Sequence, residues 1–167
     1  FGELETNFYK RNGKELSYNN LVDVDSAVSL MAEFKKSEPT FAILKHTNAC
    51  GVATRPTVLQ AWKDALAADP VSAFGGVLIC NKQIDEATAR EIDELFYEVL
   101  IAPSFSDEAL AVLSAKKNRI LLQLHTYPKA TQQVKSILDG YIVQDMDHLT
   151  EDLATIKVAT NRKPSDS

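Results

Sequence analysis

The chain has 167 residues, of which 45% are hydrophobic and 25% are charged, and this is enough for one domain with its own core. Its formal net charge of −5 does not provide the basic surface that nucleic acid or an anionic membrane attracts. No apolar run approaches the ~20 residues that span a bilayer. The first residues carry neither an initiator Met nor a signal peptide. We therefore expect a part of a longer protein that binds neither nucleic acid nor membrane.

The two cysteines, Cys50 and Cys80, lie among apolar or small residues and lack Cys-x-x-Cys spacing. In a chain without a secretion signal, such cysteines are expected to be free thiols in a reducing compartment. The sequence therefore predicts a cytoplasmic protein.

The first forty residues predict one weak strand and one helix. Residues 3–10 alternate in the manner of a strand, and Asn12–Gly13 is a turn signal. Residues 24–36 carry apolar side chains at helical spacing, and Asp25 can cap this helix. Pro39 then ends the helix and leads into a strand.

The sequence is organised around residues 41–51, Phe-Ala-Ile-Leu-Lys-His-Thr-Asn-Ala-Cys-Gly. The apolar run at 41–44 predicts a buried strand of a sheet that is covered on both faces. Lys45 and His46 follow at once, a cation beside the side chain that most readily exchanges protons near neutral pH. A loop then turns the chain, and Gly51 is expected to adopt a backbone conformation that other residues cannot. Because open α/β sheets present their sites at the carboxyl edge, we predict a site here.

Helices and apolar strands alternate over the next seventy residues. Three helices are predicted from their caps and spacing: 58–68 after Thr57, a helix from Asp85 or Glu86 whose inward face reaches Phe96, and a helix after Ser106. Three apolar strands are predicted: 77–80, 99–102 and 120–124. This alternation is typical of an α/β domain with three layers.

The last third of the chain changes character. Residues 134–138 and 141–145 flank the hairpin signal Asp139–Gly140, and such a pair commonly lies at the edge of a mixed sheet. From Thr150 the sequence becomes polar and has little to bury. We predict one domain over residues 1–149 and a frayed polar tail over residues 150–167.

Three positions carry candidate chemistry, and each has a plain structural alternative. Lys45 and His46 are either a catalytic pair or two neighbours that point to opposite faces by chance. In the loop at 74–76, paired glycines either permit a tight turn or bring backbone N–H groups to an anionic or planar ligand, with Phe74 as a stacking wall. Glu98 immediately precedes an apolar strand and can reach the edge of the sheet.

A metal site is not supported by the sequence. Zinc deaminases need a Glu two residues after a His, followed later by a Cys-x-x-Cys pair. Asn48 stands at the position of that Glu after His46, and Cys50 has no partner at the required spacing. Neither a P-loop nor a GxGxxG motif follows any predicted strand. We therefore expect no zinc.

The runs KHTNACGVA, DPVSAFGG and IAPSFSDEAL closely resemble the transformylase part of the bifunctional purine biosynthesis enzyme. In that enzyme, aminoimidazole carboxamide ribonucleotide transformylase is joined to inosine monophosphate cyclohydrolase. GKELSYNNL and DGYIVQDMD are also similar to family segments, so the resemblance spans about residues 8–147. It implies a three-layer α/β/α fold with a mixed sheet, cytidine-deaminase-like, which occurs twice in the complete transformylase. This chain resembles the first of those two units, without the cyclohydrolase domain.

The resemblance also implies an activity and its residues. The family transfers a formyl group from its cosubstrate, 10-formyltetrahydrofolate, to the 5-amino group of the ribonucleotide. His46 matches the histidine that takes the proton of the amine, and Lys45 matches the lysine that stabilises the oxyanion or assists the leaving nitrogen. Four positions match residues that contact the nucleotide: Asn20, Phe74, Gly75 and Glu98. The full-length enzyme is expected to be a homodimer, and the 167 residues alone to be inactive.

Three interpretations of the sequence stay open. The first is the formyl-transfer unit. The second is a deaminase-like hydrolase, against which the missing Glu and Cys pair count, and a zinc assay would decide it. The third is a folded module that is inert or binds a nucleotide without catalysis, and titration with the ribonucleotide separates it from the first.

Overall fold

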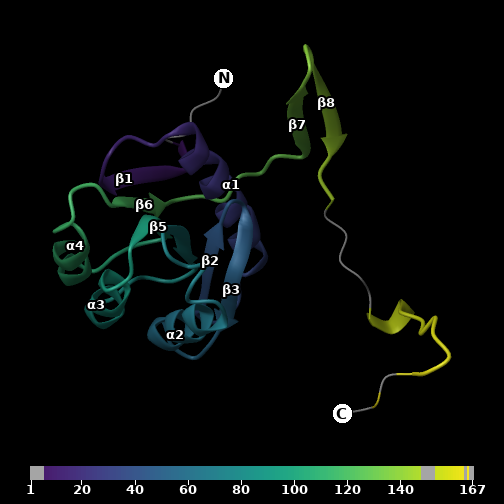
Figure 1. Cartoon of the computed structure of the whole chain (residues 1–167), viewed down its shortest axis with the longest axis horizontal. Coiled ribbons are helices and arrows are strands. Elements are labelled where there is room, and N and C mark those ends of the chain that lie inside the picture. The colour runs from purple at the N-terminus through teal and green to yellow at the C-terminus, as the bar shows by residue number, and fades with distance from the viewer. Residues whose placement is uncertain (1–5, 148–152, 164, 166–167) are drawn as a thin grey trace. The chain divides into compact units, whose positions relative to one another are not determined.

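The computed structural model describes residues 6–147, 153–163 and 165 (Figure 1), which fall into two compact units. One unit ends at Pro128 and the other begins at Lys129. The predicted division into a domain of residues 1–149 and a tail of residues 150–167 stays a prediction. Residues 3–5 of the predicted first strand and residues 150–152, 164, 166 and 167 of the predicted tail lie outside the described residues.

The first unit is built on a six-stranded mixed sheet in the order β1-β6-β5-β4-β2-β3. Its strands are β1 (Phe8–Asn12), β2 (Thr40–Lys45), β3 (Asn48–Thr54), β4 (Gly76–Cys80), β5 (Tyr97–Ala102) and β6 (Ile120–Leu124). Strands β4, β5 and β6 are parallel, whereas β1, β2 and β3 each pair antiparallel with their neighbours. The predicted strands at 77–80, 99–102 and 120–124 are confirmed, since their apolar side chains are buried on both faces of the sheet.

Helices cover both faces of this sheet (Figure 1). They are α1 (Tyr18–Glu33), α2 (Val58–Ala68), α3 (Glu86–Asp93) and α4 (Asp107–Leu113). Helix α1 packs on one face and α2, α3 and α4 on the other. The predicted caps Thr57 and Ser106 are confirmed, and of the two predicted starts of α3 it is Asp85 that caps the helix. Each of the three side chains accepts a hydrogen bond from a backbone N–H three residues on. The unit therefore has the predicted three-layer α/β/α fold with a mixed sheet.

Alternation along β2 connects the two hydrophobic cores. Ala42 and Leu44 face α1, whereas Phe41 and Ile43 face α2 and its neighbours, and all four are buried. The ring of Trp62 meets that of Phe41 edge to face, with centroids 5.1 Å apart. Burying each large side chain of this kind stabilises the fold by about 1.5–3 kcal/mol. The apolar run at 41–44 is thus a buried strand that is covered on both faces, as the sequence predicts.

Helix α1 begins earlier than predicted, and its cap is Ser17 rather than Asp25. The Ser17 hydroxyl accepts from the Asn20 backbone N–H at 3.1 Å, and the Asn20 side chain accepts from the Ser17 N–H at 3.1 Å. This is a capping box in which Asn replaces the usual Glu or Gln. Asp25 is exposed within the helix. The prediction failed because polar residues in the first turns hide the apolar spacing, which becomes clear only from Val24 onward.

The expected loop after Lys45 is wrong, because residues 48–54 form strand β3 and pair with β2 as a hairpin. The reason why position 51 needs a glycine is also different from the one predicted. Its φ is not positive, but a Cβ at this position would lie 2.0 Å from the Ala65 carbonyl oxygen of α2. Gly51 therefore provides space for α2 to pack against the backbone of β3.

Buried Arg119 fixes the start of β5. Its guanidinium pairs with the Asp93 carboxylate, donates to the Leu95 carbonyl at 3.1 Å and lies 4.1 Å from the centre of the Tyr97 ring. The side chain is only 3% exposed, so loss of these partners would leave a buried charge uncompensated. Arg119 thus ties β6 to the end of α3 and to the first residue of β5.

The second unit contains the predicted hairpin, formed by β7 (Gln132–Ile137) and β8 (Gly140–Asp145). The expectation that it extends the edge of the larger sheet is wrong, because β7 and β8 form a two-stranded sheet of their own. A short 3-10 helix, η2 (Leu153–Thr155), follows. Among the described residues of both units, no helix has the length and apolar character to cross a membrane.

The close approach at Gly51 generates a first prediction. Gly51→Ala should lower the free energy of unfolding by about 1–3 kcal/mol, because the new methyl group forces α2 away from β3. Urea unfolding followed by circular dichroism measures the change. Gly140→Ala is the matched control, since its Cβ would meet only the Ile137 carbonyl oxygen at 4.0 Å. Equal stability of the Gly51 variant and the parent would contradict the packing account.

A second prediction concerns alkaline pH. Burial raises the pKa of the Cys80 thiol from 9.0 to about 12. The folded chain therefore keeps a proton that the unfolded chain loses, so stability is full below about pH 9 and falls as the pH rises toward 12. Urea midpoints at pH 8 and pH ~10.5 measure this decline. Cys80→Ala should show a shallower decline, and identical slopes in both proteins would refute the assignment.

Candidate functional site

The site predicted around Lys45 lies where three strand ends meet. Because β2 is antiparallel to β4, its carboxyl end lies beside the start of β4, where Leu44 pairs with Val77. Gly76 in turn pairs with Tyr97 at the start of β5. The predicted site at the carboxyl end of β2 thus lies beside the amino ends of β4 and β5.

Lys45 contacts the loop that precedes β4. Its ammonium donates a hydrogen bond to the Phe74 carbonyl oxygen at 2.5 Å. A Cβ on Gly75 would lie 3.9 Å from the Lys45 nitrogen, and Gly75 has a φ of +73°, which favours glycine. The tight turn predicted as one alternative for this loop is present, and the Gly76 N–H donates to the Ala73 carbonyl at 3.0 Å. The other alternative, backbone N–H groups that approach a ligand, stays a prediction.

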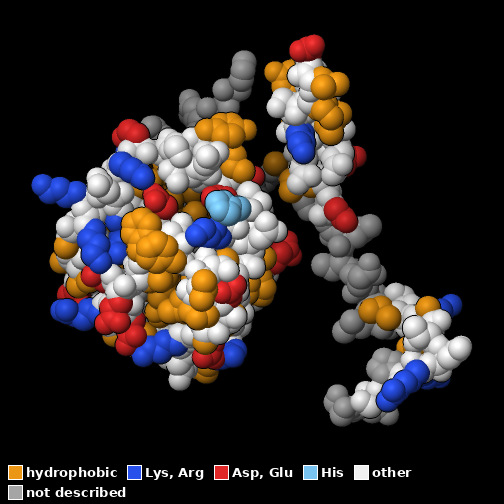
Figure 2. Space-filling view, in the orientation of Figure 1, with side chains coloured by type: hydrophobic (Ala, Val, Ile, Leu, Met, Phe, Trp, Pro, Cys, Tyr) orange, Lys and Arg blue, Asp and Glu red, His pale blue; other side chains and the backbone are white. Residues whose placement is uncertain are grey.

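Two exposed aromatic rings lie beside this cation. The rings of Phe74 and Phe96 are 5.1 Å apart between centroids, with side chains 57% and 50% exposed. The Gly75 N–H donates to the Phe96 carbonyl at 2.8 Å, which ties the two loops together. On the face shown in Figure 2, hydrophobic side chains lie beside basic ones and a histidine. Exposed rings near an ammonium suit a flat ligand that carries negative charge.

Phe96 is a residue that the sequence analysis misplaced. It was predicted on the inward face of the third helix, but α3 ends at Asp93 and Phe96 lies in the turn before β5. Helical spacing continues past the true end of α3, so the pattern alone could not show where the helix stops.

His46 lies in the tight turn between β2 and β3. Lys45 pairs with Asn48, and the two residues between them, His46 and Thr47, have φ values of +51° and +67°. Positive φ at both central residues is the geometry of a type I′ hairpin turn, which normally uses Asn and Gly. The His46 carbonyl accepts from the Thr47 hydroxyl at 2.6 Å and from the Asn48 side chain at 2.8 Å. The chain thus turns directly after Lys45 and leaves His46 exposed.

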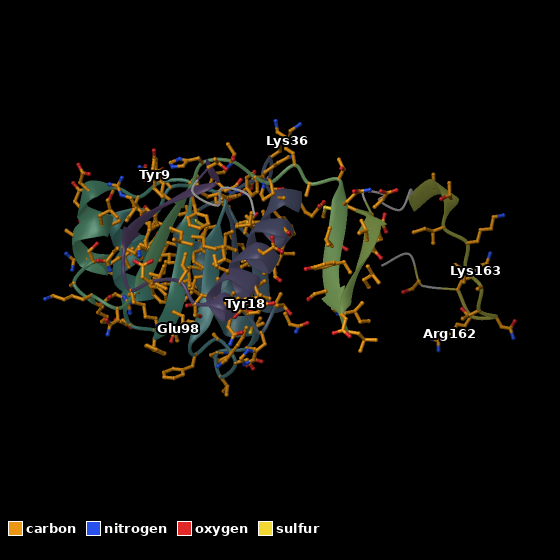
Figure 3. All side chains as sticks on the ribbon, turned by 90° about the horizontal axis from the view of Figure 1, so that it is seen from above. Tyr9, Tyr18, Lys36, Glu98, Arg162 and Lys163 are labelled. Atoms are coloured by element: carbon orange, nitrogen blue, oxygen red, sulfur yellow. The ribbon has the colours of Figure 1, made fainter. Side chains whose placement is uncertain are left out.

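Asn20 and Glu98 lie around this edge in different settings. Asn20 belongs to the capping box of α1, where its side-chain oxygen is already engaged. Glu98, the second residue of β5, pairs with Lys14 at 2.9 Å and is partly exposed. Figure 3 shows Glu98 toward the end of the sheet where α1 begins at Tyr18. Within the described residues, no hydrogen bond or ion pair joins Asn20 or Glu98 to Lys45.

The deaminase alternative can be compared with the observed geometry. Asn48 stands where a zinc deaminase has Glu, and its side chain instead holds the turn. Partial burial, with the nearby Asp69 charge adding to it, raises the pKa of Cys50, so this thiol stays protonated near neutral pH. Cys50 and Cys80 are both free, as predicted. The described part of the chain holds no group of three or more His, Cys, Asp or Glu arranged to bind a metal.

The fold and the edge formed by the end of β2 and the starts of β4 and β5 define the class of the protein. It is a three-layer α/β/α domain with candidate polar and aromatic groups at the strand ends. The chain belongs to the family described as AICARFT/IMPCHase bienzyme, whose model matches residues 3–167. The resemblance drawn from the sequence motifs is thereby confirmed.

Relatives and one solved structure are similar to this chain. The bifunctional purine biosynthesis protein PurH of Bacteroides thetaiotaomicron is 50% identical over 99% of this chain and 32% of its own length. The protein of the same name from Enterococcus faecalis is 45% identical over 92% of this chain and 30% of its own length. The chain thus spans about a third of these relatives. A dCMP deaminase from cyanophage S-TIM5 matches 64% of this chain and 98% of its own, with 13% identity and a TM-score of 0.44.

Proposed function

We propose that this chain forms part of a transformylase site in a full-length purine biosynthesis enzyme. In this proposal, a formyl group moves from 10-formyltetrahydrofolate to the 5-amino group of 5-aminoimidazole-4-carboxamide ribonucleotide. The observation that carries the proposal is the contact of Lys45 with the Phe74–Gly75 loop, with His46 as the next residue, in a member of the AICARFT/IMPCHase family. Relatives that share about half of its residues bear the name of a purine biosynthesis protein.

The first step requires a general base. The amine of the ribonucleotide is conjugated with its imidazole ring and carboxamide, so it is a poor nucleophile until a proton is removed during attack. His46 is exposed, and no hydrogen bond from a described residue occupies its ring, so its imidazole is available to accept that proton. A positioned base contributes ~10²–10⁴ to the rate.

The second step requires a group that stabilises negative charge. When the amine nitrogen bonds to the formyl carbon, the formyl oxygen becomes an oxyanion. Collapse of this intermediate breaks the bond to the folate nitrogen, which leaves with a proton. The Lys45 ammonium, now held by the Phe74 carbonyl, is suited to stabilise the oxyanion or to supply that proton.

The remaining predicted residues are proposed to contact the nucleotide. The exposed ring of Phe74 offers a stacking surface, and Gly75 lets a ligand approach the backbone. The side-chain NH2 of Asn20 makes no hydrogen bond to a described residue, since only the side-chain oxygen serves the helix cap, so the NH2 can donate to an oxygen of the ligand. The Glu98 carboxylate can accept from ribose hydroxyls, in exchange for or together with Lys14.

Two wider parts of the proposal rest on the family resemblance. They are the homodimeric state of the full-length enzyme and its location in the cytoplasm. The free thiols Cys50 and Cys80 are consistent with a reducing compartment.

A third prediction isolates His46 in the full-length protein. His46→Ala should lower kcat for formyl transfer by ~10²–10⁴, with a smaller effect on nucleotide affinity, because a base acts on the transition state. Lys45→Ala should also lower kcat, and the double variant should lose less than the product of the two effects. Steady-state kinetics and nucleotide titration measure both quantities.

Cyclohydrolase activity with already formylated nucleotide is the internal control, and it should survive the His46 substitution. If His46 only shapes the turn, thermal stability and nucleotide binding should fall together with turnover. Turnover within a few-fold of the parent would remove His46 as the base.

A fourth prediction concerns residues 1–167 alone. They should show no measurable formyl transfer, because they correspond to about a third of their relatives and catalysis depends on positioning both substrates. A coupled assay of the purified chain, with the full-length protein as positive control, measures this. Robust transfer by the chain alone would contradict the proposal, because residues 1–167 would then suffice to position both substrates.

A further inference from the structure

The turn that carries His46 has a conformation that its own sequence does not favour. His46 and Thr47 both have positive φ, and neither is glycine. For a β-branched residue such as Thr47 this conformation is rare, and each such residue strains the backbone. A conformation of this kind persists only where surrounding structure holds it.

The holding contact comes from a different element. The Thr47 backbone N–H donates to the Asp23 carboxylate at 2.9 Å, and Asp23 lies in α1, 24 residues earlier. A hydrogen bond to an ionised carboxylate is roughly twice as strong as one between neutral groups. The side chains of Thr47 and Asn48 brace the turn from within, whereas Asp23 attaches it to the body of the domain.

Asp23 is itself firmly placed. The next residue, Val24, is 4% exposed, and Ala27 is fully buried against the sheet. Asn20, one of the proposed nucleotide contacts, lies three residues before Asp23 and therefore on the same side of α1. One face of one helix thus carries both a candidate ligand contact and the anchor of the His46 turn.

We propose that Asp23 is a positioning residue. By accepting a hydrogen bond from the Thr47 N–H, it fixes the position of His46 relative to the nucleotide. This inference rests on the proposed function, because it assigns Asp23 a part in the same site. Without the bond, the turn is free to relax toward negative φ, and His46 moves with it. A displacement of about 1 Å at a reacting group can cost ~100-fold in rate. Asp23 touches no substrate in this account and acts only through the turn.

The first test needs no activity. In the full-length protein, Asp23→Ala removes the acceptor, Asp23→Leu removes it while keeping the shape of the side chain, and Asp23→Asn keeps an acceptor oxygen. Hydrogen–deuterium exchange of the peptide that contains Thr47 should be faster in the Ala and Leu variants and near the parent rate in the Asn variant. Asp25→Ala is the matched control, because Asp25 is an exposed carboxylate of the same helix. Unchanged exchange in both the Ala and Leu variants would overturn the proposal.

The second test separates position from binding. The Ala and Leu variants should lower kcat for formyl transfer by ~10- to 100-fold, with nucleotide KM changed far less. Asp23→Asn should restore most of the turnover, and Asp25→Ala should match the parent. Equal losses in the Asn and Ala variants would overturn the role of the hydrogen bond. A His46→Ala protein with normal turnover would instead refute the proposed base, and the exchange result would still decide whether Asp23 holds the turn.

Discussion

The antiparallel pairing of β2 with β4 is the constraint on which the candidate site depends. Because β4 and β5 are parallel to each other and opposite to β2, the last residue of β2 meets their amino ends. Lys45 can therefore reach the Phe74 carbonyl, 29 residues later. A register slip of one residue would exchange the faces of Leu44 and Ile43, which pack into different cores. Burial thus fixes the register, and the register fixes the position of Lys45.

Stability and candidate chemistry are located in different parts of the first unit. Phe41, Trp62 and their neighbours bury apolar surface on both sides of the sheet, and Arg119 fixes the start of β5 from the interior. The candidate groups lie at strand ends, in the turns beside them and in the first turn of α1, where side chains are exposed or partly exposed. A turn that carries unfavourable φ values, as at His46, is tolerated because the well-packed strands and helix on either side hold it.

Charge has a positional role at the same edge. Lys45 is held by a backbone carbonyl and Glu98 by Lys14, so each candidate group has a partner that a ligand could replace. These contacts are partly exposed, and pairs of this kind contribute little to stability. Their exchange for ligand contacts would therefore have a small energetic cost. This is compatible with a site that orders its charged groups before a substrate binds.

The sequence by itself determined the local elements and the fold class. The apolar runs at 77–80 and 120–124, and the caps Thr57 and Ser106, depend on neighbours within a few residues, so their pattern predicts them directly. The tertiary structure alone decided the direction of β2 within the sheet, the pairing of β3 and the bond from Asp23 to Thr47. The direction of β2 and the bond from Asp23 to Thr47 join residues far apart in the chain, and strand pairing depends on which faces become buried together. Strand β3 pairs with its neighbour in the chain, but its turn, His46–Thr47, lacks the Asn-Gly type of signal that predicts a hairpin. No local pattern carries that information.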